Sequence, residues 1–385
     1  MTEEVVSAPT GNRFDRMEMA GAFGDLGTLV PFVVAYLAVL KMDPFGVLFA
    51  FGIAMLVCGF VYRTPIPVQP MKAAGAIATT QAAQTLTLTP AMVHGASLVT
   101  GLIWLVLGLT GTANRVANLV KRPIVIGIIL GLGFGFMIEG AKMMSQNWWI
   151  GGAALLGTSL LLTNRVIPAM FLLLLFGAAY GIATDPTLIL ALRSVEIEPR
   201  LPTFALSMLT WNDLLIGTVF LALPQVPLTL GNAVIAITEE NNRLFPARPV
   251  SEAKIATSTG LMNMLSASVG GVPMCHGAGG MAGHVQFGAR TGGAVVILGA
   301  VLLLTAIFFS GSVGTFLRLF PTSILGVILF LTGAQLALGS CDFGKDKGER
   351  FVTLVTGALA VWNVGIAFVV GMTAYALVKR GLLRL

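Results

Sequence analysis

Residues 64–72 read Thr-Pro-Ile-Pro-Val-Gln-Pro-Met-Lys, and residues 270–280 read Gly-Gly-Val-Pro-Met-Cys-His-Gly-Ala-Gly-Gly. Each stretch begins with prolines or glycines and then continues into small residues that suit a short helix. Pro67 and Pro70 prevent a continuous helix here, because proline lacks a backbone N–H and clashes with the preceding turn. Proline is well suited to the first position of a new helix. We therefore predict two extended segments, each followed by a half-helix, the first of which begins near Pro70.

The chain around these two stretches is strongly apolar. Of its 385 residues, 56% are hydrophobic and 10% are charged, and its mean hydropathy is +0.89. A soluble domain is about 25% charged, so this composition excludes a soluble enzyme, a disordered chain and a nucleic-acid binder. A membrane-spanning helix needs about 20 apolar residues. The composition therefore predicts an all-α polytopic, multi-pass integral membrane protein in contact with the lipid bilayer.

Apolar stretches separated by short polar breaks predict about fourteen transmembrane segments in two sets of seven. The spans are 19–40, 44–62, 70–85, 91–111, 122–141, 147–163, 165–183, 211–237, 252–269, 277–288, 292–310, 320–338, 350–363 and 364–379. This division gives an N-terminal cytoplasmic segment (1–18), a first seven-span repeat (19–184), an extracytoplasmic connector (185–210) and a second seven-span repeat (211–385). No cleavable signal peptide is visible, because the first 18 residues have no apolar core.

The distribution of lysine and arginine tests this topology. With a cytoplasmic N-terminus, 17 of the 23 basic residues fall in inside loops and 5 fall outside. Positive residues gather on the cytoplasmic side, so this bias supports an even number of spans with both termini inside the cell. The same rule explains the net charge of +6. We expect the protein in the inner or plasma membrane.

Weak internal repeats relate the two halves. A shift of 206 residues superposes Pro67 on Pro273, and a shift of 199 superposes Gly127 on Gly326. Because seven is odd, two seven-span halves have opposite orientations, which predicts a 7+7 inverted repeat. Interrupted segments at corresponding positions are the best sequence indication of a transporter's binding site. Here they are the third and tenth spans.

The half-helix ends are the predicted binding site. The second half-helix begins near His276 or Gly277. A free helix N-terminus carries unpaired N–H donors and about half a positive charge, so two such ends at the membrane midplane bind an anion. The glycines at 277, 279 and 280 let a ligand approach the backbone. The alternative is that they only permit tight helix packing.

Lys72 falls in the first turn of the first half-helix. A lysine within a membrane is costly unless it is paired or functional. It either attracts the anion directly or forms a structural pair with Asp25 or Glu139. A lysine at a helix N-terminus is unfavourable without a nearby anion, which favours the functional role.

Neutral hydrogen-bonding residues surround these segments in the first and eighth spans. Gln225 and Thr229 are four residues apart, which places them on one helix face, with Asn232 one turn further on. Gln69 and Thr28 are similar neutral residues in the first half. They either contact an oxyanion or act as polar links between helices.

The titratable residues indicate how transport is coupled. Neither the third nor the tenth span contains a carboxylate, which disfavours a site for a cation or a neutral nucleobase. The potential proton carriers are Asp25, His276, Glu139 and His94, and we prefer Asp25 because it lies near the middle of a span. The chain has no motif for metal-dependent or serine hydrolysis and no Walker motif, so we predict no enzymatic activity, no bound metal and no cofactor.

These motifs resemble the molybdate transporter family, a branch related to the sulfate permeases. The resemblance covers about residues 17–340, and its matching stretches are 24–28, 67–72, 223–232, 272–280 and 287–290. It implies core and gate domains, with spans 1–4 and 8–11 in the core and spans 5–7 and 12–14 in the gate. Sulfate permeases add a C-terminal STAS domain, and from this sequence we expect a protein without that domain. Related transporters often dimerise through the gate, which suggests a homodimer.

The resemblance implies a secondary active transporter that imports molybdate by alternating access. Sulfate or another oxyanion is the alternative substrate, and a proton-coupled nucleobase permease or a non-transporting channel or receptor is a more distant one. Asp25 is the coupling residue in this interpretation. The residues expected to bind the anion are Thr28, Gln69, Pro70, Met71, Lys72, Gln225, Thr229, Cys275, His276, Gly277 and Ala278.

Overall fold

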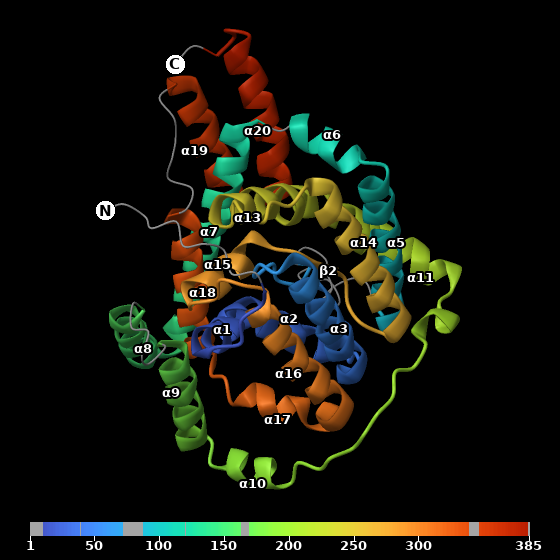
Figure 1. The fold of residues 1–385 in the computed structure, drawn as a ribbon, viewed down its shortest axis with the longest axis vertical. Coiled ribbons are helices and arrows are strands. Elements are labelled where there is room, and N and C mark those ends of the chain that lie inside the picture. Colours follow the sequence, from blue (N-terminus) through green and yellow to red (C-terminus); the bar gives the residue numbers. More distant parts are fainter. Residues whose placement is uncertain are drawn as a thin grey trace.

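The computed structural model describes residues 11–38, 40–71, 88–119, 121–162, 169–338 and 346–383, and these are mostly helical (Figure 1). The helices and strand of the first half are α1 (Arg16–Ala22), the short 3₁₀ helix η1 (Phe23–Asp25), α2 (Leu26–Ala38), α3 (Pro44–Tyr62), β1 (Gln69–Pro70), α5 (Pro90–Leu109), α6 (Thr112–Leu119), α7 (Arg122–Met144), η3 (Ser145–Asn147), α8 (Trp148–Leu161), α9 (Ala169–Thr184) and α10 (Thr187–Arg193).

The second half follows a connector that runs along the edge of the molecule from α10 to α11 (Figure 1). Its elements are η4 (Ala205–Met208), α11 (Trp211–Ile216), η5 (Gly217–Ala222), α12 (Leu223–Leu228), η6 (Thr229–Ala236), α13 (Ile237–Leu244), α14 (Glu252–Val269), β2 (Met274–Cys275), α15 (Ala278–Gln286), α16 (Gly293–Phe309), η7 (Ser310–Ser312), α17 (Val313–Arg318), α18 (Thr322–Leu338), α19 (Lys347–Trp362) and α20 (Val364–Lys379).

Local sequence explains where these helices begin and end. The Asp43 carboxylate caps α3 by accepting from the Phe45 N–H, and Ser251 caps α14 by accepting from the Lys254 N–H. Such caps satisfy backbone donors that have no partner within the helix. Both helices end in a left-handed residue, Arg63 with φ +57° and Gly270 with φ +80°. The chain then continues in an extended conformation toward β1 or β2.

Helices lie at every predicted span that the structure describes. The third predicted span, 70–85, falls mostly within residues 72–87, which are outside the described part of the chain. α3 and α14 have the predicted bounds. Among the described residues, four helices are long and apolar enough to cross a membrane, and a fifth candidate is the pair α9 and α10, which is bent by 108°. The span count of fourteen remains a prediction.

The helices pack in two groups. In the first group α14 packs on α5 and α3, while α16 packs on α3 and α1. In the second group α7 packs on α18 and α19, and α19 packs on α20. The helix α15 packs on α18 of the second group and also on η1 and on α1 of the first group. The centre of the molecule, where β2 lies (Figure 1), is therefore enclosed by both groups.

Large apolar side chains are exposed on the outer helices. Trp149 on α8 is 89% exposed, and Leu160 on α8 and Leu175 on α9 are also exposed. Soluble monomers seldom carry contiguous apolar surfaces of this kind. These side chains fit a surface that faces lipid.

Candidate functional site

The two interrupted stretches cross at the centre of the fold. β1 and β2 pair as antiparallel strands, with Gln69 opposite Cys275 and Pro70 opposite Met274. The Met71 N–H also donates to the Pro273 carbonyl at 2.8 Å. Two extended segments that are some 200 residues apart in sequence thus satisfy each other's backbone groups. The prediction of extended backbone at both stretches is confirmed, and extended backbone can be tolerated at membrane depth only where protein encloses it.

The helix α15 begins directly after this crossing. Gly277 is its N-cap residue and Ala278 its first residue, so the helix begins within two residues of the predicted start near His276 or Gly277. The Gly280 N–H donates to the Gly277 carbonyl at 3.1 Å. The N–H groups of Ala278 and Gly279 come before the first helical hydrogen bonds, so they offer donors and positive potential at the crossing. All of α15 from Ala278 to Val285 is buried. The first half-helix cannot be compared with it, because Lys72 and the residues up to 87 lie outside the described residues.

Three glycines leave room for neighbouring side chains at the start of α15. A Cβ atom on Gly277 would lie 1.9 Å from Gln69 Oε1, and one on Gly279 would lie 2.1 Å from the Phe136 ring. A Cβ atom on Gly280 would lie 2.6 Å from Gln69 Nε2 and 2.9 Å from Asp25 Oδ2. Because a Cβ atom cannot approach these atoms so closely, a larger residue at any of the three positions would force a neighbouring side chain to move. The glycine cluster thus lets the side chains of Gln69, Phe136 and Asp25 lie close to the backbone of α15.

Asp25, Thr28 and Gln69 form a buried hydrogen-bonded group beside α15. The Gln69 Nε2 donates to Asp25 Oδ1 and to Thr28 Oγ1, each at 2.5 Å. The Thr28 hydroxyl also bonds to the Asp25 carboxylate and to the Asp25 carbonyl. All three side chains are at most 4% exposed. The structure therefore brings the expected coupling residue into contact with two expected anion ligands.

The eighth predicted span contributes a second polar group. Gln225 Nε2 donates to Thr229 Oγ1 at 3.0 Å, and both side chains are buried, so the prediction that they share one helix face is confirmed. The buried Asn232 Nδ2 lies 3.8 Å from where a Cβ on Gly277 would be. Asn232 Oδ1 has no hydrogen-bond partner among the described residues. Asn232 and Gln69 therefore approach Gly277 from different segments.

The His276 ring is already bonded on both sides. Its Nδ1 lies 2.8 Å from the Pro67 carbonyl oxygen, so this nitrogen carries a hydrogen and donates it. Its Nε2 lies 2.7 Å from Ser258 Oγ on α14. The ring thus links the two extended segments and α14. An anion contact at His276 would come from its backbone; the side chain is occupied in this arrangement.

The remaining predicted site residues lie either at the crossing or away from it. Pro70 and Cys275 lie within the two strands, and Met71 follows β1, with all three buried. Of the other potential proton carriers, Glu139 pairs with Lys142 at 3.6 Å on an exposed part of α7. His94 lies on α5 and its side chain hydrogen-bonds to Gly270, at the start of the second extended segment. Asp25 is the acid that the fold places at the crossing.

Sequence reasoning missed the residues of α14 that hold the second extended segment. The Asn263 side chain accepts from the Met274 N–H at 2.9 Å and donates to the Met274 carbonyl at 2.5 Å. Ser266 Oγ donates to the Val272 carbonyl at 2.6 Å. Ser258 bonds to His276 and to the Tyr62 hydroxyl. The spacing of these polar residues along α14 was the only available signal, since their partners lie on another segment.

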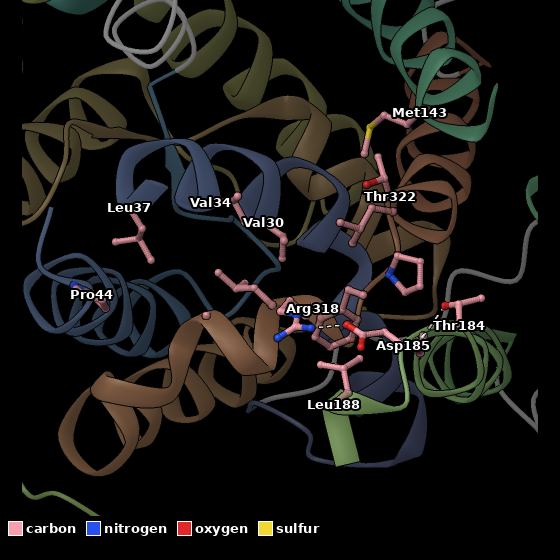
Figure 2. A pocket seen from close by; sticks show the side chains of 16 residues that line it. Val30, Val34, Leu37, Pro44, Met143, Thr184, Asp185, Leu188, Arg318 and Thr322 are labelled. Carbon is pink, nitrogen blue, oxygen red and sulfur yellow. Dashed lines mark hydrogen bonds and ion pairs between the residues drawn. The ribbon is translucent and has the colours of Figure 1, made fainter. Parts of the chain in front are cut away.

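A cavity of about 690 Å³ lies between α2 and α3 on one side and α7, α9, α10, α17 and α18 on the other. Figure 2 shows Val30, Val34 and Leu37 facing it from one side, with the ion pair between Arg318 and Asp185 at the opposite wall. No described residue of the predicted anion site lines it. Hydrogen bonds from Thr187 and then from Arg318 hold the pKa of Asp185 below its usual value. The cavity is therefore distinct from the crossing.

Known proteins resemble this chain over the stretches that form the crossing. A family model described as "Molybdate transporter of MFS superfamily" matches residues 17–136 and 217–336, which include both strands and the start of α15. The chain belongs to this molybdate transporter family. Among curated relatives, Molybdate transporter 1 of Arabidopsis thaliana is 31% identical over 93% of this chain and 87% of its own length. Molybdate transporter 1 of Chlamydomonas reinhardtii is 27% identical over 94% of this chain and 91% of its own length.

Solved structures show the fold. The transmembrane domain of the cyanobacterial bicarbonate transporter BicA has a TM-score of 0.56 with 15% identity, covering 94% of this chain and 97% of that domain. The murine Slc26a9 anion transporter in its inward-facing state has a TM-score of 0.63 with 14% identity, covering 96% of this chain and 69% of that chain. Together, the family and the fold make this protein an integral membrane anion transporter, and not an enzyme.

Proposed function

We propose that this protein imports molybdate as a secondary active transporter that works by alternating access. The observation that carries the proposal is the crossing of β1 and β2, which places buried amides beside a glycine-lined helix N-terminus. Such an end supplies N–H donors and positive potential without a full charge. The names of the curated relatives support molybdate as the anion.

In this proposal the anion lies at the start of α15, next to the crossing of β1 and β2. The backbone of His276, Gly277 and Ala278 supplies donors from one side. The side chains of the neutral residues complete the shell, and Cys275 and Met71 lie beside it as parts of the crossing. The neutral side chains that the proposal assigns to the anion are Thr28, Gln69, Gln225 and Thr229.

Alternating access requires two bodies that move past each other. We assign spans 1–4 and 8–11 to a core and spans 5–7 and 12–14 to a gate, within a 7+7 inverted repeat and with cytoplasmic termini. Two observations support this assignment: the helices pack in two groups, and the two stretches matched by the family model begin 200 residues apart. The cavity between α2 and α18 then lies between core and gate. We propose a homodimer formed through the gate.

Calorimetry on the purified chain tests the substrate, with sulfate as the competitor. We expect molybdate to bind tightly and excess sulfate to displace it poorly. Displacement of molybdate by an equal concentration of sulfate would instead make the protein a general oxyanion transporter. If neither anion binds, the oxyanion site at the helix ends is wrong, and nucleobases become the next solutes to test.

Uptake by proteoliposomes separates a carrier from a channel or a receptor. A carrier accumulates labelled molybdate and saturates as its concentration rises. A channel gives ion currents far above the turnover of a carrier, while a receptor binds the anion without uptake. Either of these results would contradict the transport mechanism while leaving the site in place.

Lys72 provides a test at the first half-helix, outside the described residues. Lys72→Ala should weaken molybdate binding by at least about tenfold, because a charge-assisted contact contributes about 1.5–3 kcal/mol. Lys142→Ala is the matched control, since Lys142 lies on an exposed part of α7 next to Glu139. Wild-type affinity in Lys72→Ala would make Lys72 a structural residue.

A further inference from the structure

The Gln69 amide presents its two ends to different neighbours. Its nitrogen donates to Asp25 Oδ1 and Thr28 Oγ1. Its oxygen lies on the other side, 1.9 Å from where a Cβ on Gly277 would be. This oxygen is buried and has no hydrogen-bond partner among the described residues, and the side chain is 1% exposed. An unpartnered acceptor is therefore directed at the N-cap of α15.

This orientation opposes an anion at the same place. An amide oxygen is an acceptor with a partial negative charge, and so is each oxygen of an oxyanion. An anion that approaches the first-turn N–H groups of α15 would meet Gln69 Oε1 as a second acceptor. In this orientation the amide takes up some of the positive potential of the helix end and repels the ligand.

Rotating the amide by half a turn removes the conflict at Gly277 and creates a new one at Asp25. The nitrogen then faces Gly277 and can donate to the anion. The oxygen then faces the Asp25 carboxylate, where two acceptors would lie 2.5 Å apart. The new conflict disappears when the Asp25 carboxyl carries a proton, because a protonated carboxyl donates one hydrogen bond. The Thr28 hydroxyl is both donor and acceptor, so it can bond to either end of the amide.

The surroundings of Asp25 indicate which group takes the proton. The elements that pack on η1 are α1, α2, α15 and α18. Glu18 on α1 accepts from the backbone N–H groups of Arg290, Thr291 and Ala294. His284 on α15 bonds to the Gly21 carbonyl through Nδ1. The other titratable residues on these elements are Arg16 on α1 and Tyr36 on α2, whereas α18 has none. Asp25 is the carboxyl that bonds directly to the Gln69 amide.

We propose that the Gln69 amide couples protonation of Asp25 to oxyanion binding, so that one proton binds together with each dianion. This inference rests on the proposed function, since it concerns the same anion site. The proton comes from the aqueous compartment to which the site is open, and Asp25 carries it as a carboxylic acid. When the anion leaves on the other side, the amide returns to its original orientation and the proton is released there.

The first test needs no variant. Molybdate binding to the purified chain is measured by calorimetry in several buffers that differ in ionisation enthalpy, over a series of increasing pH values. We expect uptake of about one proton per molybdate bound, and an affinity that falls about tenfold for each unit of pH. Binding without proton uptake at any pH overturns the coupling and leaves the proposed function intact. Absence of oxyanion binding at every pH overturns both.

Asp25→Asn tests the same link from the other side. The asparagine amide can donate to Gln69 Oε1 as a protonated carboxyl would, so it holds the Gln69 amide in its anion-binding orientation. We expect binding that takes up no proton and no longer changes with pH. Asp185→Asn is the control, because Asp185 lies at the wall of the cavity between α2 and α18, away from the crossing. This variant should take up as many protons on binding molybdate as the wild type does. Proton uptake by Asp25→Asn equal to that of the wild type assigns the proton to another group and contradicts the proposal.

Discussion

The two extended segments at the crossing reach the same conformation by opposite means. The first, residues 64–71, contains three prolines, which have fixed φ angles and no N–H groups that need partners. The second, residues 270–277, contains three glycines and one proline, so its backbone is freer and its donors need partners. Asn263, Ser266 and Ser258 on α14 hold this second segment in place.

The two segments also contribute different chemical groups to the site. The first segment contributes a side chain, the Gln69 amide, on a stiff backbone. The second contributes the buried backbone at Gly277, which has no side chain. A change in one segment therefore should not have the same consequence as the corresponding change in the other.

Gly277→Ala should have the largest effect. The new methyl group would lie 1.9 Å from Gln69 Oε1, so it would displace the Gln69 amide and obstruct the helix end. We expect molybdate affinity to fall by at least about a hundredfold, as expected when two charge-assisted contacts are lost. Calorimetry would measure the loss. Gly152→Ala is the control, because nothing lies within 4 Å of its new Cβ. If Gly277→Ala keeps the wild-type affinity, molybdate binding does not depend on the lack of a side chain at residue 277.

Asn263→Leu should break the support of the second segment. It leaves the Met274 N–H and carbonyl without their α14 partner, and each unpaired buried group costs about 1–3 kcal/mol. We expect the free energy of unfolding to fall by about 3 kcal/mol, seen as a lower melting temperature in detergent. The exposed Thr305 on α16 provides a control, Thr305→Val. An unchanged melting temperature in Asn263→Leu would mean that the second segment holds itself in place.

Pro67→Ala tests the stiffness of the first segment and should have a smaller effect. It frees the φ angle at residue 67 and adds one N–H to a buried site, while the carbonyl that His276 binds remains. Loss of a proline costs about 0.4–1 kcal/mol through the unfolded chain. We expect a loss near 1 kcal/mol in the same melting assay. A loss as large as that of Asn263→Leu would remove the distinction between the two segments.

The smallest effect should come from the ion pair at the cavity wall, far from either segment. Thr187 and Arg318 lower the pKa of Asp185 from its usual 3.8, so the pair stabilises the protein above pH 3.8 and loses this effect as the pH falls through the lowered pKa. Asp185→Asn should melt slightly below the wild type at neutral pH. Melting curves at decreasing pH should show this gap closing. If the difference in melting temperature instead widens at low pH, the ionised Asp185 does not stabilise the protein through Arg318 and Thr187.

Much of the fold was predictable because proline, glycine and hydropathy act locally. The extended segments, the start of α15 near Gly277, and the shared face of Gln225 and Thr229 all follow from short-range rules. The bond between Asp25 and Gln69 joins residues 44 positions apart, and that between Asn263 and Met274 depends on how a helix packs on an extended segment. No local rule contains such partners. His276 shows the limit most clearly, since its position was predicted but the bonds of its ring to Pro67 and Ser258 were not.

The pairing of β1 with β2 has a consequence for biosynthesis. The first segment leaves the ribosome long before its partner strand exists, since Gln69 and Cys275 are about 200 residues apart. At about 5–20 residues per second, synthesis of the second strand follows roughly 10–40 seconds later. During this interval the nascent first half must keep its extended backbone in contact with water or with the insertion machinery. Because proline has no backbone N–H, the prolines of the first segment reduce the number of N–H groups that lack a partner during this interval. This composition suits the half that is synthesised first.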